Sequence, residues 1–206
     1  MSFNYDTLLE EALESTVDVK IDGMSRYLSS DYLVVKLHGS INWAHKILAP
    51  EIQQNAVDTE VASRVIDKAQ QLDISPEFDL ISRSQLARSN SGAIIPALSI
   101  PVANKSVYEC PKEQQQVLTD LLPTVDKVLM IGWKGGEARF LELLAQRMNK
   151  QARILVISSS EAKASEIIIK LSKSLRIGVA NYFFAGKGGF SRSITSHEAD
   201  EFLRSL

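Results

Sequence analysis

The segment His38-Gly39-Ser40 directly follows a mostly apolar run, Tyr32 to Leu37. A histidine in this place can act as a general base, because its imidazole exchanges a proton near neutral pH. The alternative is a partly buried histidine that hydrogen-bonds to the backbone, and the residue types leave both open. Neither His45 nor His197 has metal-ligand spacing to another histidine. His38 is therefore the first candidate for a proton-transfer residue.

Two segments in the second half of the chain could bind a phosphorylated ligand. Gly132-Trp133-Lys134-Gly135-Gly136 opens a helical pattern, and helix N-terminal amides attract phosphate, although these glycines could serve only a tight turn. Ser158-Ser159-Ser160 follows the apolar run 153–157, and its hydroxyls could bond to a ribose or cap a helix. The ring of Trp133 could line a ligand pocket or cover the core.

Short apolar runs alternate along the chain with amphipathic helical patterns, an organisation typical of an α/β fold. The apolar runs predict buried strands at 32–37, 128–132, 153–157 and 177–184. The helical patterns predict helices at 51–72, 113–122, 137–149 and 161–174, with a further helix near each terminus. Thr7-x-x-Glu10, or Asp6, predicts the start of the first helix, and Thr195-x-x-Glu198 predicts that of the last.

Strands separated by helices predict a parallel sheet whose carboxyl ends share one edge. Ligands bind outside that edge in open α/β sheets. The rule selects four segments: Asn4-Tyr5-Asp6, His38-Gly39-Ser40, 132–136 and 158–160. The serine-rich stretch 73–91 predicts a loop, and the segments 92–96 and 100–102 are predicted to be extended because of their prolines.

Composition narrows the class of protein. The 206 residues are 45% hydrophobic, and 23 basic against 25 acidic residues give a net charge of −2, so we expect neither a nucleic-acid binder nor an anionic-membrane binder. Cys110 is the single cysteine, which excludes an internal disulfide and a Cys-rich zinc site. No apolar run is long enough for a transmembrane helix, and the N-terminus lacks a signal-peptide pattern, so the cytoplasm is the expected compartment.

Two motifs resemble a pair found in the sirtuin-like NAD-consuming proteins of bacteria. They are Asn4-Tyr5-Asp6-Thr7-Leu8-Leu9-Glu10 and Lys36-Leu37-His38-Gly39-Ser40-Ile41-Asn42-Trp43. In that superfamily an Asn-x-Asp motif and a His-Gly motif meet at the nicotinamide ribose. Further matches are Ile131-Gly132-Trp133, followed by Glu137 and Phe140, and Gly188-Gly189-Phe190-Ser191. The resemblance covers almost the whole chain, and it is not to the zinc-containing deacylases, which carry four zinc-binding cysteines.

The resemblance implies a Rossmann-like parallel sheet flanked by helices and the hydrolysis of NAD at its nicotinamide–ribose bond, without zinc. By similarity, Asn4 would position the ribose or the attacking water, and His38 would act as the general base. Asp6 would hydrogen-bond to the nicotinamide carboxamide. Gly132 and its neighbour Trp133 would face the phosphates or the adenine ribose, and Ser158 would bond to a ribose hydroxyl. In relatives such domains are often fused to other modules and serve in antiphage defence.

The resemblance further implies that the chain is the C-terminal part of such a domain. The family begins with a strand and a Gly-Ala-Gly turn that grips the pyrophosphate, and no residue before Asn4 supplies it. We therefore expect one N-terminally incomplete domain over 1–206, with a helical or loop insertion at about 44–92. An incomplete sheet exposes an edge, which a second copy or a partner chain would cover. The alternatives are an inactive nucleotide-binding sensor and an interaction module.

Overall fold

The computed structural model describes residues 1–48, 63, 67, 71–81, 94–99, 107–176 and 183–205. Contacts divide the chain into two compact units, Met1–Gln116 and Val117–Leu206, and each unit has its own sheet. Several predicted segments lie largely or wholly outside the described residues, namely the helix 51–72, the end of the loop 73–91, the extended segment 100–102 and the first part of the strand 177–184.

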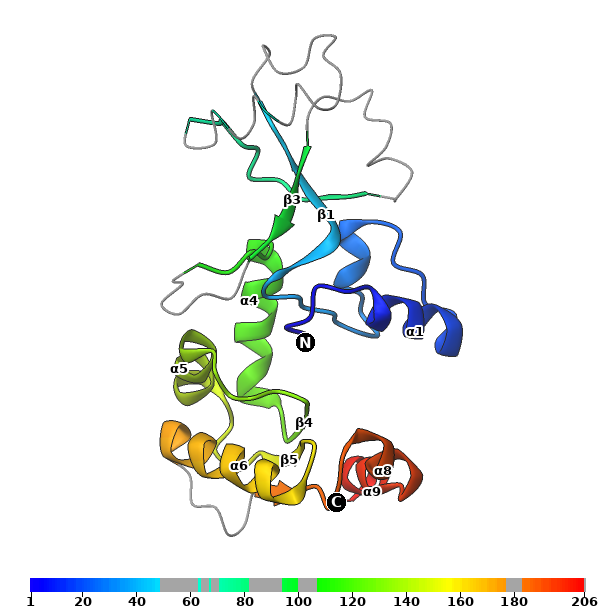
Figure 1. Ribbon diagram of the computed structural model, residues 1–206, viewed down its shortest axis with the longest axis vertical. Coiled ribbons are helices and arrows are strands. Elements are labelled where there is room, and N and C mark those ends of the chain that lie inside the picture. Colours follow the sequence, from blue (N-terminus) through cyan, green and yellow to red (C-terminus); the bar gives the residue numbers. More distant parts are fainter. Residues whose placement is uncertain are drawn as a thin grey trace. The chain divides into compact units, whose positions relative to one another are not determined.

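The first unit contains a three-stranded sheet in the order β2-β1-β3, and both pairings are antiparallel. Its elements are α1 (Leu8–Val17), the 3-10 helix η1 (Met24–Tyr27), β1 (Gly39–Lys46), β2 (Asp79–Leu80), β3 (Ile94–Leu98) and the start of α4 (Lys112–Leu121). β1 and β3 run side by side (Figure 1). The sequence predicted only parallel strands, and a loop where β2 lies, so the antiparallel sheet corrects both expectations. The extended segment predicted at 92–96 is confirmed by β3 over its described residues, 94–96.

Trp43 lies at the centre of the first unit's core. Its side chain is fully buried, and its ring makes edge-to-face contacts with Tyr27 at 5.0 Å and with Phe78 at 5.7 Å between ring centroids. Its indole N–H donates to the Tyr27 hydroxyl at 3.0 Å, so the one polar atom of the ring is satisfied inside the core. Trp43 therefore belongs to the core of this unit.

The predicted strand 32–37 is wrong as a strand but right as a buried segment. Val34, Val35 and Leu37 are buried, yet only isolated bridges form at Leu33 and Lys36. The backbone groups of this segment are satisfied one by one by different partners: Val34 N donates to Tyr27 O, Ser2 N to Val35 O and Glu109 N to Leu37 O. Burial requires satisfied backbone groups but not a regular ladder, so an apolar run cannot by itself specify a strand. Residues 37–38 form a turn that leads into β1, which begins at Gly39.

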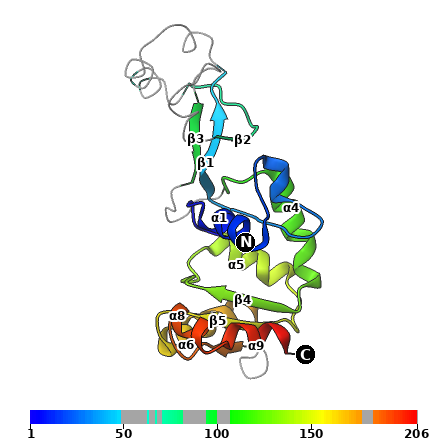
Figure 2. The same ribbon diagram turned by 90° about the vertical axis from the view of Figure 1, so that its right-hand side faces the viewer.

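The second unit contains a parallel sheet in the order β4-β5-β6, which confirms the α/β prediction for this half of the chain. Its elements are η3 (Leu122–Thr124), β4 (Lys127–Ile131), α5 (Ala138–Arg147), β5 (Arg153–Ile157), α6 (Glu161–Leu175), β6 (Phe183–Ala185), α8 (Phe190–Thr195) and α9 (Glu198–Arg204), preceded by the end of α4. β4 pairs with β5 along its whole length, from Lys127 opposite Arg153 to Ile131 opposite Ile157. Figure 2 shows this unit turned by 90°.

Helices cover both faces of the parallel sheet. Leu155 and Ile157 of β5 form a core with Ala199 and Phe202 of α9. The alternate residues of β5 point to the opposite face, because side chains alternate along a strand. That face belongs to α6, whose buried stripe has helical spacing: Ala164, Ile167, Ile168, Leu171 and Leu175. Figure 1 shows α6 and α9 on opposite sides of β5. The described residues include no helix long and apolar enough to cross a membrane.

Both predicted capping boxes are wrong. Thr7 is the N-cap residue of α1, but its hydroxyl donates to Glu11 Oε1 at 2.6 Å and Glu10 points into the unit. Helix α9 begins at Glu198, after His197 in the left-handed conformation, and Thr195 instead ends α8. In each case the glutamate carboxylate accepts a hydrogen bond from a more distant residue. Glu10 accepts from the Lys36 ammonium, and Glu198 accepts from the backbone amide of Lys187. These tertiary contacts replace the local cap that the sequence motif predicts.

Candidate functional site

The N-terminal segment lies alongside the segment that carries His38, although about 30 residues separate them in the sequence. Ser2 N donates to Val35 O at 2.8 Å, and Leu37 N donates to Ser2 O at 3.3 Å. Further along, Ile41 N donates to Tyr5 O at 2.9 Å. These hydrogen bonds bring the Asn4-Tyr5-Asp6 segment and the His38-Gly39-Ser40 segment into one neighbourhood.

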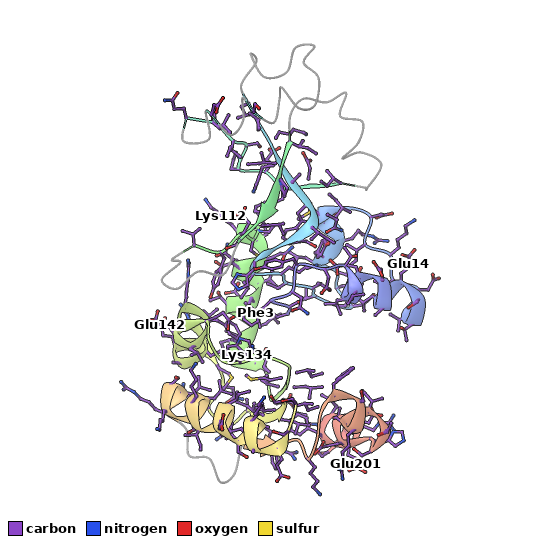
Figure 3. The ribbon with its side chains drawn as sticks, in the orientation of Figure 1. Phe3, Glu14, Lys112, Lys134, Glu142 and Glu201 are labelled. Carbon is purple, nitrogen blue, oxygen red and sulfur yellow. The ribbon has the colours of Figure 1, made fainter. Side chains whose placement is uncertain are left out.

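His38 is half-buried as a residue, both of its ring nitrogens are buried, and its ring packs near two aromatic side chains. Phe3, labelled in Figure 3, lies 5.4 Å from it and Tyr5 lies 6.3 Å from it, measured between ring centroids. The backbone carbonyl of His38 accepts from Ser99 N at 2.9 Å, and the Tyr5 hydroxyl donates to Ser99 O at 3.1 Å. Asn4, between the two aromatic residues, is exposed. The histidine is thus held by its backbone and packed by Phe3 and Tyr5.

Asp6 has two contacts that anchor the segment. Its carboxylate Oδ1 accepts from Leu8 N at 3.2 Å, which satisfies an N-terminal amide of α1. Its backbone carbonyl accepts from the ammonium of Lys36. The side chain is half-buried at the start of the helix. Asp6 therefore contributes to the helix start that the sequence predicted for Asp6 or Thr7.

Gly39 allows the backbone to pass β3 without a clash. Its φ is +81°, and a Cβ at this position would overlap the carbonyl oxygen of Ala97 and lie 2.9 Å from the carbonyl carbon. Both atoms belong to the backbone of β3, which cannot turn aside as a flexible side chain can. The glycine therefore determines how the turn at His38 enters β1.

Sequence reasoning missed a buried polar cluster directly beneath this site. Lys36 is only 1% exposed, and its ammonium donates to Glu10 Oε1 at 2.9 Å and to Ser40 Oγ at 2.7 Å, besides the Asp6 carbonyl. Ser40 is fully buried, and its hydroxyl in turn donates to Tyr5 O at 3.1 Å. A lysine in the middle of an apolar run was the available signal, because lysine is almost never fully buried unless it is paired.

Tyr27 extends this cluster toward the core. Its hydroxyl donates to Glu10 Oε1 at 2.9 Å and accepts from Trp43. Burial, and next the negative charge of Glu10, raise the pKa of the Tyr27 phenol well above its ordinary value. The phenol therefore stays protonated and keeps donating to Glu10 throughout the physiological pH range.

His45, also in the first unit, has a different environment from His38. Its Nδ1 lies 2.8 Å from Glu77 O and its Nε2 lies 2.7 Å from Glu109 Oε1, while its ring packs on Phe78 at 4.3 Å. Both ring nitrogens therefore have protein partners, and both partners are hydrogen-bond acceptors. His45 anchors β1 to the neighbouring loops, which leaves His38 as the histidine to consider for chemistry.

In the second unit, the loops that follow neighbouring strands share the carboxyl edge of the sheet. Gly132 follows β4 and Ser158 follows β5, and the residues before them, Ile131 and Ile157, pair in register. Gly132 is exposed, has a φ of +67° and donates its amide to Ile157 O at 2.9 Å. The structure thus brings together these two predicted positions.

Other side chains at this edge form hydrogen bonds with nearby residues of the same loops and helices. The indole N–H of Trp133 donates to Glu137, and its ring makes an edge-to-face contact with Phe140 at 5.6 Å. Ser160 is the N-cap of α6 and accepts from Lys163 N at 3.3 Å, whereas Ser158 is half-buried one residue beyond β5. The sequence left capping and ribose binding open for this serine triplet. The structure assigns the cap to its last member.

Cys110 is expected to be unreactive in the native protein. Its thiol is buried, and burial followed by the charges of Glu109 and Glu113 raises its pKa to about 12. The thiolate is the nucleophile, so below that pH the folded protein offers almost none. Iodoacetamide at pH 8 should leave native protein unmodified by intact mass during an interval in which urea-unfolded protein reacts completely. Equal rates in the two states would contradict this environment for Cys110.

Comparison with known proteins assigns no family: no family model matches the chain, and no curated protein matches it significantly. Within the described part of the chain, no group of three or more His, Cys, Asp or Glu side chains is arranged to hold a metal ion.

Proposed function

We propose that the chain is a sirtuin-like domain that binds NAD and cleaves the bond between nicotinamide and ribose. The observation that supports this most is the pairing of the two motif segments: Tyr5 O accepts from Ile41 N and from Ser40 Oγ, and the Asp6 carbonyl accepts from Lys36. A site that carries both motifs requires that these distant segments meet. The resemblance alone also suggests a role for NAD consumption in antiphage defence.

Hydrolysis breaks the C1′–N bond and adds water, giving nicotinamide, ADP-ribose and a proton. Positive charge develops on the ribose as the bond breaks, so the protein has to orient the sugar and activate the water. We assign the proton-accepting role to His38 and the orientation of the ribose or water to the exposed Asn4. We propose that the nicotinamide carboxamide donates a hydrogen bond to Asp6 Oδ2, because Asp6 Oδ1 already accepts from Leu8 N.

The second unit supports the proposal of a Rossmann-like fold for that unit alone. Its three strands are parallel, helices cover both faces, and Gly132, Trp133 and Ser158 lie beside the carboxyl ends of neighbouring strands. In open α/β sheets that edge binds nucleotides. We propose that these three residues contact the phosphates or a ribose of a bound nucleotide.

The test is nicotinamide release from NAD by the purified full chain, followed by chromatography. We expect release by the wild type and a loss of at least about 100-fold for His38→Ala and for Asn4→Ala, the magnitude typical of losing a general base or a positioning contact. The matched histidine control is His197→Asn, because His197 is exposed in the second unit and asparagine tolerates its left-handed backbone. This control should keep wild-type turnover.

Three other outcomes would contradict the proposal or redirect it. Full turnover in both alanine variants would show that the assigned roles are wrong. Binding of NAD without cleavage would favour the alternative, a nucleotide-binding sensor without catalysis. An absence of binding at millimolar NAD by calorimetry would exclude both the enzyme and the sensor, and would leave an interaction module as the remaining interpretation.

A further inference from the structure

The ammonium of Lys36 links the N-terminal segment to the start of β1. Its partners are the backbone carbonyl of Asp6, the carboxylate of Glu10 in α1 and the hydroxyl of Ser40 in β1. A lysine ammonium has three N–H donors and no acceptor, so three acceptors satisfy it completely. Full satisfaction and the opposite charge of Glu10 explain how the lysine can be 1% exposed.

The cluster around Lys36 reaches both sides of the candidate site. Toward the N-terminal segment, Lys36 bonds directly to Asp6 O and, through Ser40 Oγ, to Tyr5 O. Toward the turn, Lys36 precedes His38 by two residues, and its own amide donates to Gln114 Oε1 at 3.2 Å. Tyr5 lies against the His38 ring, so any shift of residues 5 and 6 also moves the packing of that histidine.

We propose that Lys36 is the positioning residue of the site: its ammonium holds the Asn4-Tyr5-Asp6 segment against the His38-Gly39-Ser40 segment. The structural half of this inference stands on the hydrogen bonds alone, whereas its catalytic half rests on the proposed function. Lys36 is buried beneath the site and acts through Tyr5, Asp6 and Ser40. Misplacement of reacting groups by about 1 Å can reduce a rate about 100-fold, so such a residue can affect turnover strongly.

The test uses a variant that removes the ammonium without leaving a buried charge. Lys36→Met combined with Glu10→Gln keeps the side-chain volumes similar and retains an amide oxygen that can accept from Tyr27. Amide hydrogen exchange then reports directly on two backbone hydrogen bonds between the segments. Leu37 N donates to Ser2 O, and Ile41 N donates to Tyr5 O. We expect the protection of these two amides to fall at least about tenfold. The Val34 amide, bonded to Tyr27 O, should stay protected.

Two further variants keep the test decisive. Ser40→Ala removes only the link from Lys36 to Tyr5 O, so a smaller loss of protection at Ile41 is expected even if the double variant folds poorly. Lys46→Met is the control, because Lys46 lies on the same strand but forms an exposed pair with Asp79 at 2.9 Å. It should leave the protection of Leu37 and Ile41 unchanged. Unchanged protection in both the double variant and Ser40→Ala would overturn the proposal.

NAD turnover separates this inference from the proposed function. In the double variant we expect kcat to fall about 100-fold, with a smaller change in KM and with the protein still folded at the assay temperature by circular dichroism. Lost amide protection with wild-type kcat would overturn the catalytic half of the inference. A wild type that neither binds nor cleaves NAD would overturn the proposed function, while the exchange data would still decide whether Lys36 holds the two segments together.

Discussion

Gly39→Ala is expected to unfold much of the first unit. A left-handed φ costs a non-glycine residue about 1–2 kcal/mol, and the overlap of the new Cβ with the Ala97 carbonyl adds to that cost. We expect a total loss above about 4 kcal/mol, a large share of the stability of a typical domain. The measurement is urea unfolding followed by the fluorescence of Trp43 in a Trp133→Phe background, because Trp43 is the remaining tryptophan and is buried in the first unit's core.

Two glycine controls separate the clash from the conformational cost. Gly23 has a φ of −163° and nothing within 4 Å of a new Cβ, so Gly23→Ala should change stability by less than about 0.5 kcal/mol. Gly132 has a φ of +67° and equally open surroundings, so Gly132→Ala should cost the second unit only about 1 kcal/mol. If Gly39→Ala proved as mild as Gly132→Ala, the close approach of Gly39 to β3 would be contradicted.

Lys36→Met alone is expected to lower the stability of the first unit by about 3–5 kcal/mol, because it leaves the Glu10 carboxylate buried without its counter-charge. Adding Glu10→Gln removes that charge, and about 1–3 kcal/mol of the loss should be recovered. The Trp43 fluorescence that reports Gly39→Ala also measures this cycle. Glu10→Gln alone completes the cycle. Tyr27 keeps an acceptor in all three variants, so the coupling energy reports the interaction between Lys36 and Glu10.

The coupling energy between Lys36 and Glu10 shows whether the two side chains interact directly. A double variant that is more stable than Lys36→Met alone would show that the pair is coupled through its burial. Losses that simply add would contradict a direct interaction between Lys36 and Glu10. The exposed pair Lys46–Asp79 offers the comparison, because exposed ion pairs contribute little to stability and Lys46→Met should therefore change little.

The sequence alone determined most of the second unit. The strand at 153–157 and the helices that begin near Lys112 and Glu161 were predicted within about two residues, because their apolar spacing is local and strong. The parallel pairing followed from the alternation of strands and helices. The helix α8 was missed, because six residues are too few to show a period.

In the first unit the sequence indicated the candidate site residues, and tertiary structure decided how their segments are held. The motifs at Asn4–Asp6 and at His38–Ser40 were visible in the printed residues, and the structure brings the two segments together. Glu10 looked like half of a capping box, yet its carboxylate pairs with Lys36 across 26 residues. The partner of Glu10 depends on which oppositely charged side chain is buried next to it in the folded protein. The spacing of residues along the chain carries no information about that partner.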